Sequence, residues 1–355
     1  MALSLDLLQK FPNTPPPAPP RKRGGETLTQ VKGGVGFFFL IYARSLFYKY
    51  RIAAIASLLL VVISILSPPA SPAPSSPSSP PTPAQLAQST TQTATNSLNQ
   101  GLLLIQAGRL QDAIAAFQKA TQIDPNLAAA HYNLGLALRQ TGQLKPAAEA
   151  FYRATQADPK FALAFANLGG ALLEGNNLQQ ANDYLQRALE LDPKLGFAHY
   201  NLGLVREQQG KWDSAIASFK KAMEYSKNAP EPPYHIGMCY LQQGKLDQAR
   251  DAFRQAIKLN PKYPEAHYNL GTIWFSKGKL TEALESFRKS AQANSNYPNA
   301  YYGAGLVFMQ QKQYAQAAQV FQYARDLYNA QSNVQWARNA EQLLQQAQNL
   351  NYQPR

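Results

Sequence analysis

The chain has 355 residues, including 34 Lys and Arg, 21 Asp and Glu and a single cysteine, Cys239. One cysteine excludes an intramolecular disulfide, and the net charge of +13 makes nucleic-acid binding a possibility to be tested. Residues 1–51 carry eight basic residues against Asp6 and Glu26, whereas residues 52–93 carry no charge. The basic excess therefore has two separate sources, the N-terminal tail and the region after residue 93.

Residues 1–34 are basic and rich in Pro and Gly, with the run PNTPPPAPPRKRGGE from Pro12 to Glu26. A segment of this composition buries too little apolar surface to fold. We expect a disordered, Pro-rich tail.

Residues 35–67 form a hydrophobic segment whose second part, Ile52 to Leu66, has no charge and no helix breaker. Extended to about residues 48–67, it is long enough for a single transmembrane helix of about 20 residues. A cleaved signal peptide is the alternative, but a long N-terminal region and prolines around Ala70 favour an uncleaved anchor. Basic residues precede the span and none follows until Arg109, so we expect a cytoplasmic N-terminus. The rest of the chain would then lie on the trans side, in a periplasm or lumen.

Residues 68–93 contain few bulky apolar residues. A Pro/Ser run, SPPASPAPSSPSSPPTPA from Ser67 to Ala84, is followed by a Gln/Thr-rich run from Gln85 to Thr93. Such sequences form extended spacers. The pattern predicts a linker that holds the following region away from the membrane.

A 34-residue sequence unit then repeats seven times between Ala94 and Gln331, without insertion or deletion. The copies occupy residues 94–127, 128–161, 162–195, 196–229, 230–263, 264–297 and 298–331. Position 8 of each copy is glycine and position 20 is alanine. Position 24 is Phe117, Phe151, Leu185, Phe219, Phe253, Phe287 and Phe321. Positions 20, 24 and 27 share one helix face, so each copy is predicted to be a helix pair that stacks on its neighbours.

The stretch HYNLGLALRQTGQLKPAAEAFYRATQADP, from His131 to Pro159, resembles the tetratricopeptide repeat (TPR) family. The resemblance implies an all-α fold, a right-handed superhelical solenoid of seven helix-turn-helix repeats. Apolar residues near helical spacing predict a capping helix over residues 332–350, followed by a tail at 351–355. The joint between copies four and five departs from the pattern, because Pro230, Pro232 and Pro233 open the next helix and predict a delayed start.

In TPR proteins, positions 2, 5, 6 and 9 of each repeat face a concave groove. Asparagines at position 6 and tyrosines at position 5 recur here, and they resemble the asparagine ladder in the TPR arm of O-linked N-acetylglucosamine transferases. Amide groups at one spacing can bond the backbone of an extended peptide, and tyrosines add contact area. A packing role for these residues is the alternative. The predicted peptide-binding residues are Asn99, Tyr132, Asn133, Asn167, Tyr200, Asn201, Tyr234, His235, Tyr268, Asn269 and Tyr302.

The sequence contains no catalytic motif, such as a nucleophile elbow, P-loop or metalloprotease helix. His131, His199 and His267 stand at position 4 of alternate copies, about 20 Å apart if helices pack at 8–10 Å, which is too far for one metal ion. We therefore expect packing histidines, no cofactor, no metal site and no enzyme. Basic residues recur at position 26 without a nucleic-acid motif, so we expect a solvated face and no nucleic-acid partner.

Together these patterns predict a membrane-anchored scaffold or adaptor that binds an extended segment of a partner protein and supports assembly of a membrane-associated complex. Two alternatives stay open. The chain could be a substrate-docking or regulatory subunit of an enzyme acting in trans, or a structural protein that assembles with copies of itself. No small-molecule substrate is evident.

Overall fold

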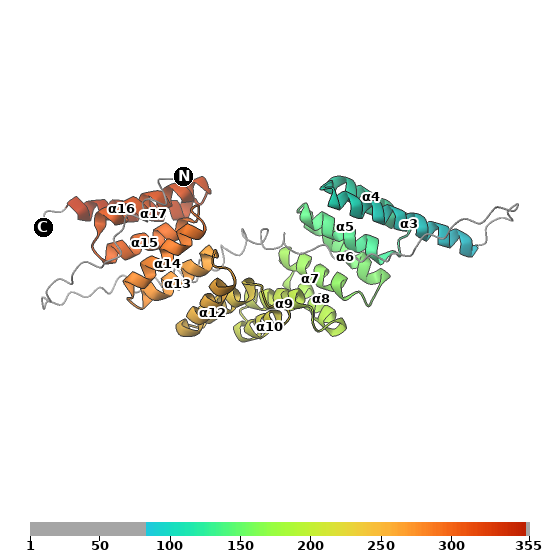
Figure 1. The fold of residues 1–355 in the computed structure, drawn as a ribbon, viewed down its shortest axis with the longest axis horizontal. Helices are drawn as coiled ribbons and strands as arrows, with labels where there is room; N and C mark the ends of the chain where they lie inside the picture. The colour runs from blue at the N-terminus through green and yellow to red at the C-terminus, as the bar shows by residue number, and fades with distance from the viewer. Residues whose placement is uncertain (1–82, 353–355) are drawn as a thin grey trace. The chain divides into compact units, whose positions relative to one another are not determined.

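The computed structural model describes residues 83–352, which form two compact units. We call residues 83–226 the N-terminal unit and residues 227–352 the C-terminal unit. Figure 1 shows each as a stack of helices. The described range contains fifteen helices and no strand. The all-α fold expected from the repeats is confirmed over this range.

Several sequence predictions concern residues outside the described range. The Pro-rich tail at 1–34, the hydrophobic segment at 35–67 with its transmembrane helix, and the Pro/Ser run are among them. Within residues 83–352, none of the helices combines the length and apolar character that a bilayer crossing requires. The membrane anchor stays a prediction.

The N-terminal unit consists of four helix pairs. They are α3 (Pro83–Gln106), α4 (Leu110–Ile123), α5 (Ala128–Gln140), α6 (Leu144–Ala157), α7 (Ala162–Glu174), α8 (Leu178–Leu191), α9 (Gly196–Gln208) and α10 (Trp212–Tyr225). Each helix contacts the next in the chain, and the first helices of neighbouring pairs touch at α3 with α5 and at α7 with α9. Stacking of this kind buries the apolar face that one pair would leave open to water.

The C-terminal unit continues the pattern and ends in an additional helix. It contains α11 (Glu231–Gln242), α12 (Leu246–Leu259), α13 (Pro264–Ser276), α14 (Leu280–Ala293), α15 (Pro298–Gln310), α16 (Tyr314–Ala330) and α17 (Val334–Tyr352). Helix α17 packs on α16 with Ala337, Ala340, Leu344 and Ala347 buried, where the sequence predicts an amphipathic helix. Helix α11 begins at Glu231, after Pro230 as its N-cap, and the boundary between the units falls just before it, between Ser226 and Lys227.

The first helix is longer than the repeat pattern predicts. Helix α3 begins at Pro83, so the Gln/Thr-rich run expected to be a linker is helical. Its threonines are accommodated because their hydroxyls bond within the helix: Thr93 donates to the carbonyl of Ser89 at 2.7 Å and Thr95 to that of Thr91 at 2.8 Å. The hydroxyl of Thr91 also donates to Asp124 at 3.3 Å, which fixes α3 against the turn after α4.

The recurring glycines have two different structural roles. At position 8, a Cβ added to Gly135 would lie 2.6 Å from the ring of Phe151, which is fully buried, so glycine is required for the two helices of the pair to approach. At position 15, Gly142 has φ of +76° and nothing would meet its Cβ, so the left-handed backbone itself selects glycine. Asn176 and Lys312 take this conformation in copies three and seven, where the glycine is missing.

Candidate peptide-binding site

The tyrosines at position 5 pack largely inside the repeats. Tyr132 on α5 is 5% exposed, and its ring centroid lies 5.8 Å from Phe151 on α6 and 4.8 Å from Phe161 before α7. The same packing on the position-24 phenylalanine, at 5.7 or 5.8 Å, recurs for Tyr200, Tyr234, Tyr268 and Tyr302. Burial raises the pKa of Tyr132 to about 12, so its phenol stays neutral. These rings mainly stabilise the stack, and their contact with a ligand stays a prediction.

Two of the position-6 asparagines connect neighbouring repeats. Asn167 on α7 is 1% exposed; its Nδ2 donates to the carbonyl of Leu163 at 2.9 Å and to the hydroxyl of Tyr132 at 3.3 Å. Asn269 on α13 likewise donates to the hydroxyl of Tyr234 at 3.4 Å. Each tyrosine belongs to the preceding repeat. These amides are therefore engaged in linking repeats, a role that the sequence pattern alone does not distinguish from ligand binding.

We call the asparagines at position 6 the asparagine row. Its other members have side-chain amide groups that are not fully hydrogen-bonded. Asn133 on α5 is 8% exposed, and its Nδ2 donates to the carbonyl of Ala129 at 2.8 Å. Its buried Oδ1 has no partner among the described residues. The corresponding Oδ1 of Asn167 accepts from Arg139 of the preceding repeat, and the residue equivalent to Arg139 one repeat earlier is Ile105, which cannot donate. The side-chain amide of Asn201 on α9 is half-buried and makes no hydrogen bond to another described residue, and Asn99 on α3 is exposed. A buried acceptor without a partner is rare in folded proteins and calls for one.

A charged pair that the sequence analysis missed lies beside this row. The guanidinium of Arg139 on α5 bonds the carboxylate of Glu174 on α7 through both Nε, at 3.0 Å, and Nη2. The two side chains are only 11% and 12% exposed. Nη1 of Arg139 also donates to Oδ1 of Asn167 at 3.3 Å, so the pair fixes α7 against α5. A Cβ at Gly170 would come within 3.1 Å of Nδ2 of Asn201, so glycine makes room for that amide.

The residue types at position 12 of the repeats indicate that Arg139 needs a charged partner. Arg139 stands at position 12 of its copy, and the corresponding residue is apolar in five other copies: Ile105, Leu173, Leu241, Phe275 and Met309. The other exception is Glu207 in copy four, which is 4% exposed. A charge in a column that is mostly apolar needs a buried partner. Its partner, Glu174, is one repeat further along and is not identified by spacing alone.

The predicted residues of the C-terminal unit are brought together in part. His235 lies edge-on to Tyr234 with ring centroids 5.3 Å apart, and Tyr234 also meets Asn269. Burial raises the pKa of Tyr268 to about 12. The asparagine row ends at Gly303, where a Cβ would lie 2.6 Å from the ring of Phe287. This unit therefore offers tyrosine and histidine where the N-terminal unit offers unpaired amides.

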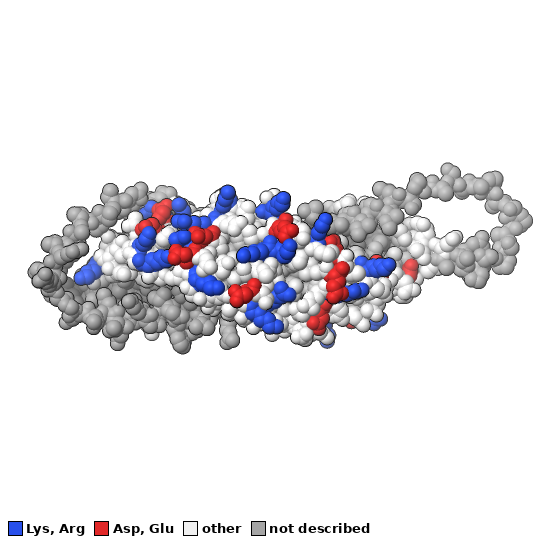
Figure 2. Space-filling model, turned by 90° about the horizontal axis from the view of Figure 1, so that it is seen from below, with Lys and Arg blue, Asp and Glu red and all other residues white. Residues whose placement is uncertain are grey.

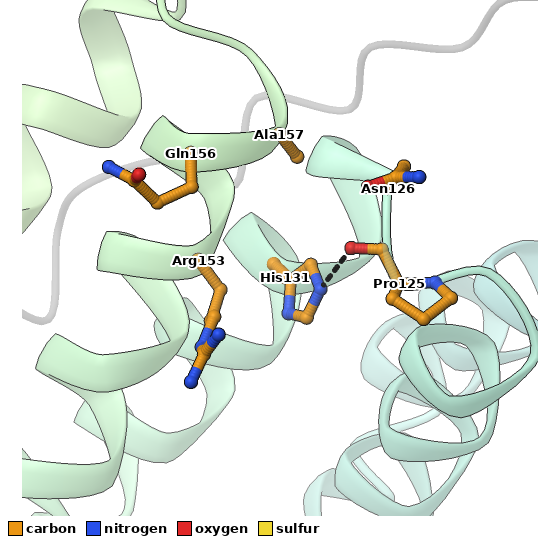
Figure 3. A pocket seen from close by; sticks show the side chains of 6 residues that line it. All are labelled: Pro125, Asn126, His131, Arg153, Gln156 and Ala157. Atoms are coloured by element: carbon orange, nitrogen blue, oxygen red, sulfur yellow. Dashed lines mark hydrogen bonds between the residues drawn. The ribbon is translucent and has the colours of Figure 1, made fainter.

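The histidines at position 4 connect each repeat to the turn before it. Nε2 of His131, His199 and His267 donates to the carbonyl of Pro125, Pro193 and Pro261, each at 2.9 Å. Figure 3 shows this bond for His131 at the edge of an open recess of about 370 Å³, lined also by Asn126, Arg153, Gln156 and Ala157. Burial lowers the pKa of His131 and His267, so both rings favour the neutral form. Recurrence of one bond in three repeats indicates a packing role.

The basic residues at position 26 are mostly paired with carboxylates. Arg153 bonds Glu149 at 2.9 Å on the same helix, and the side chains of this pair are 63% and 62% exposed. Equivalent pairs join Arg187 to Glu190, Lys221 to Glu224 and Lys289 to Glu285. Figure 2 shows Lys and Arg interspersed with Asp and Glu on the face that it presents. This row is a solvated, salt-bridged helix surface.

The stacked helix pairs with recurring glycine, phenylalanine and proline also occur in known proteins. Residues 75–300 match the sequence model of the TPR family described as cilia and flagella-associated protein 70 C-terminal domain. The chain belongs to this family. No curated protein matches the chain.

Three solved structures are among those similar to this chain, and the first two share its fold. A tetratricopeptide repeat protein from Parabacteroides merdae is 20% identical over 72% of this chain and 99% of its own, with a TM-score of 0.54. PilF of Pseudomonas aeruginosa is 21% identical over 60% of this chain and 96% of its own, with a TM-score of 0.52. YrrB, described as a TPR protein with an unusual peptide-binding site, is 25% identical over 55% of this chain and 99% of its own, with a TM-score of 0.45.

Proposed function

We propose that this TPR protein is a non-enzymatic scaffold that binds an extended segment of a partner protein along the first helices of its N-terminal unit. The observation that carries the proposal is the buried Oδ1 of Asn133, which has no hydrogen-bond partner among the described residues. Once the side chain of Asn133 turns toward a bound segment, a backbone N–H of that segment would satisfy this oxygen without regard to the segment's side chains.

The neighbouring row supports a ligand of defined length. Asn201 lies two repeats further along, and its side-chain amide makes no hydrogen bond to another described residue. If helices pack about 8–10 Å apart, two repeats place these amides about 20 Å from each other. An extended chain rises about 3.3 Å per residue, so the bound segment would contain at least about six residues.

Membrane anchoring completes the proposal. The hydrophobic segment around residues 48–67 would hold the protein as a single-pass anchor, with the basic tail in the cytoplasm and the repeats on the periplasmic or lumenal side. The repeats would then recruit partners into a membrane-associated complex. Protease protection of the repeats in sealed vesicles is the expected result, and digestion from the cytoplasmic side would contradict the orientation.

Photo-crosslinking from native membranes tests the binding site. A photoreactive amino acid at position 201, on α9, is expected to cross-link one contiguous segment of a partner, identified by mass spectrometry. The same group at Asn182, on the second helix α8, provides the control for random contact. Cross-links to that partner from position 182 and none from position 201 would place binding elsewhere on the repeats.

A synthetic peptide of the captured segment then gives the energetics. Asn133→Ala/Asn201→Ala should weaken its binding by roughly 10- to 30-fold, because two hydrogen bonds of about 1 kcal/mol are lost. Asn182→Ala is the matched control and should leave the affinity unchanged. Asn167 is left intact, since its bonds to Tyr132 and Arg139 hold the fold. An unchanged affinity in the folded double variant would refute the role of the asparagine row.

A further inference from the structure

Three cations surround one tryptophan in the C-terminal unit. The ring of Trp274 on α13 is approached by the guanidinium carbons of Arg250 and Arg254 on α12, at 5.9 and 5.5 Å from its centroid, and by Nζ of Lys279 at 5.0 Å. We call these four residues the Trp274 cluster. Trp274 is 9% exposed, so the cations and neighbouring helices cover most of the indole. Cation–π contacts hold charged groups in place without neutralising them.

Only one of the three cations forms ion pairs with carboxylates, whereas Asp251 and Asp247 act on Arg254 and Lys279 at longer range. Arg250 bonds Asp247 and Asp251, each at 2.8 Å, and Lys277 shares Asp247 at 2.5 Å. Arg254 and Lys279 are exposed and form no ion pair with a described carboxylate. The cluster therefore presents two positive charges that form no ion pair with a described carboxylate, the guanidinium of Arg254 and the ammonium of Lys279, both next to the ring of Trp274.

The surrounding charge matches this local excess. Residues 245–289 contain nine Lys and Arg against five Asp and Glu, a net charge of +4. One of the five acids, Glu265, is largely buried, and burial raises its pKa. The remaining carboxylates, among them Asp247 and Asp251, stand between the cations. A nucleic acid or an anionic bilayer binds to a broad surface of uniformly positive potential. A peptide with a few spaced carboxylates can instead bind to a surface on which positive and negative side chains alternate.

The cluster is separate from the asparagine row. At 100° per residue, Trp274 lies about 140° around α13 from Asn269 and about 160° from Thr272. A ligand at the Trp274 cluster would therefore approach the opposite side of this helix. Binding there would not compete with a segment held by the asparagines of the first helices.

We propose that the Trp274 cluster is a docking site for the carboxylates of an acidic segment of a partner protein, with Arg254 and Lys279 as the receiving groups. A guanidinium accepts a carboxylate as a bidentate, charge-assisted hydrogen-bond partner. The indole limits the motion of both cations, which reduces the entropy lost on binding.

The test uses the full chain in neutral detergent and a fluorescein-labelled ten-residue peptide of alternating Glu and Ser, followed by anisotropy at low salt. Arg254→Gln/Lys279→Gln should weaken binding about tenfold, a loss of about 1.4 kcal/mol. Lys262→Gln/Lys312→Gln removes the same charge from exposed turns of the same unit, before α13 and between α15 and α16, and should change binding less than twofold. A Gln/Ser peptide should not bind.

A second readout localises the peptide. In Trp212→Phe/Trp336→Phe, Trp274 is the remaining tryptophan, and its emission should change as the Glu/Ser peptide binds. Equal losses in both double variants, or an unchanged emission, would overturn the proposal in favour of a diffuse basic field. Tighter binding of phosphatidylserine vesicles or duplex DNA than of the peptide, lost in Arg254→Gln/Lys279→Gln, would overturn the assignment to an acidic protein segment.

Discussion

The two units use the same repeat but connect successive copies in different ways. In the N-terminal unit, Arg139 and Glu174 form an ion pair between repeats whose side chains are 11% and 12% exposed. In the C-terminal unit, Lys277 and Asp247 form an ion pair between repeats with side chains that are 27% and 67% exposed. An ion pair can thus connect repeats in the interior or at the surface. The free energy lost when one partner is removed is much larger for the buried pair.

The overall charge and the aromatic content follow the same division. Residues 83–226 carry twelve Lys and Arg against eleven Asp and Glu, whereas residues 227–352 carry thirteen against eight. The C-terminal unit buries Tyr297, Tyr301 and Tyr328 almost completely, at 2%, 2% and 1% exposure. The near-neutral unit thus has a buried ion pair between repeats, whereas the basic unit buries more tyrosines and has its ion pair between repeats at the surface.

The largest expected difference between the units comes from breaking these pairs. Arg139→Ala would leave Glu174 buried without a partner and remove a donor from Asn167, at a cost of about 3–5 kcal/mol. Lys277→Ala removes a mostly exposed contact and should cost less than about 1 kcal/mol. Urea unfolding is followed by Trp212 for the N-terminal unit and by Trp274 for the C-terminal unit, in chains where the other tryptophans are phenylalanine.

The double replacement Arg139→Met/Glu174→Leu separates the cost of an unpaired charge from the value of the pair. It should recover most of the stability lost in Arg139→Ala, because apolar residues of similar volume often replace a buried ion pair without loss. A double variant as unstable as Arg139→Ala would show that the pair contributes specific stabilisation of its own.

The asparagines that connect repeats provide an intermediate effect. Asn167 makes bonds to Leu163, Tyr132 and Arg139 and is 1% exposed, whereas Asn269 is 9% exposed and donates at 3.4 Å to Tyr234. Asn167→Ala should therefore cost about 2–3 kcal/mol and Asn269→Ala about 1 kcal/mol. The same two tryptophan reporters measure both. Equal costs would mean that the contact with Arg139 adds nothing to the N-terminal unit.

One substitution is expected to stabilise the protein instead. Burial raises the pKa of Glu265 on α13, so its ionisation is less favourable in the folded chain than in the unfolded chain. Stability contributed by the protonated form is lost as pH rises above the ordinary glutamate range. Glu265→Gln should therefore stabilise the C-terminal unit by about 1 kcal/mol at pH 7, and the gain should vanish below about pH 4. A gain that persists at pH 4 would point to a cause other than ionisation.

The position-5 tyrosines show how far pattern reasoning reaches. Their recurrence at one spacing identifies a functional or packing column, and the TPR resemblance assigns that column to a groove. Tyr132 is nevertheless 5% exposed, since Phe151 and Phe161 enclose its ring. The enclosing residues belong to a second helix and to the next turn, and the spacing of one column does not show whether they leave the ring open.

The sequence by itself determined the helix pairs, their 34-residue period and the small residues at the helix contacts. These features follow from local periodicity and from the space that Gly135 must leave for Phe151. Only the tertiary structure decided which polar groups find partners. The hydroxyl of Tyr132 accepts from Asn167 one repeat later, and Arg139 meets Glu174. Oδ1 of Asn133 meets no described donor, because Ile105 stands in the preceding repeat where Arg139 serves Asn167. A hydrogen bond needs a donor and an acceptor about 3 Å apart. Repeats of the same period differ in their side chains, so only some of them place a donor or acceptor at that distance.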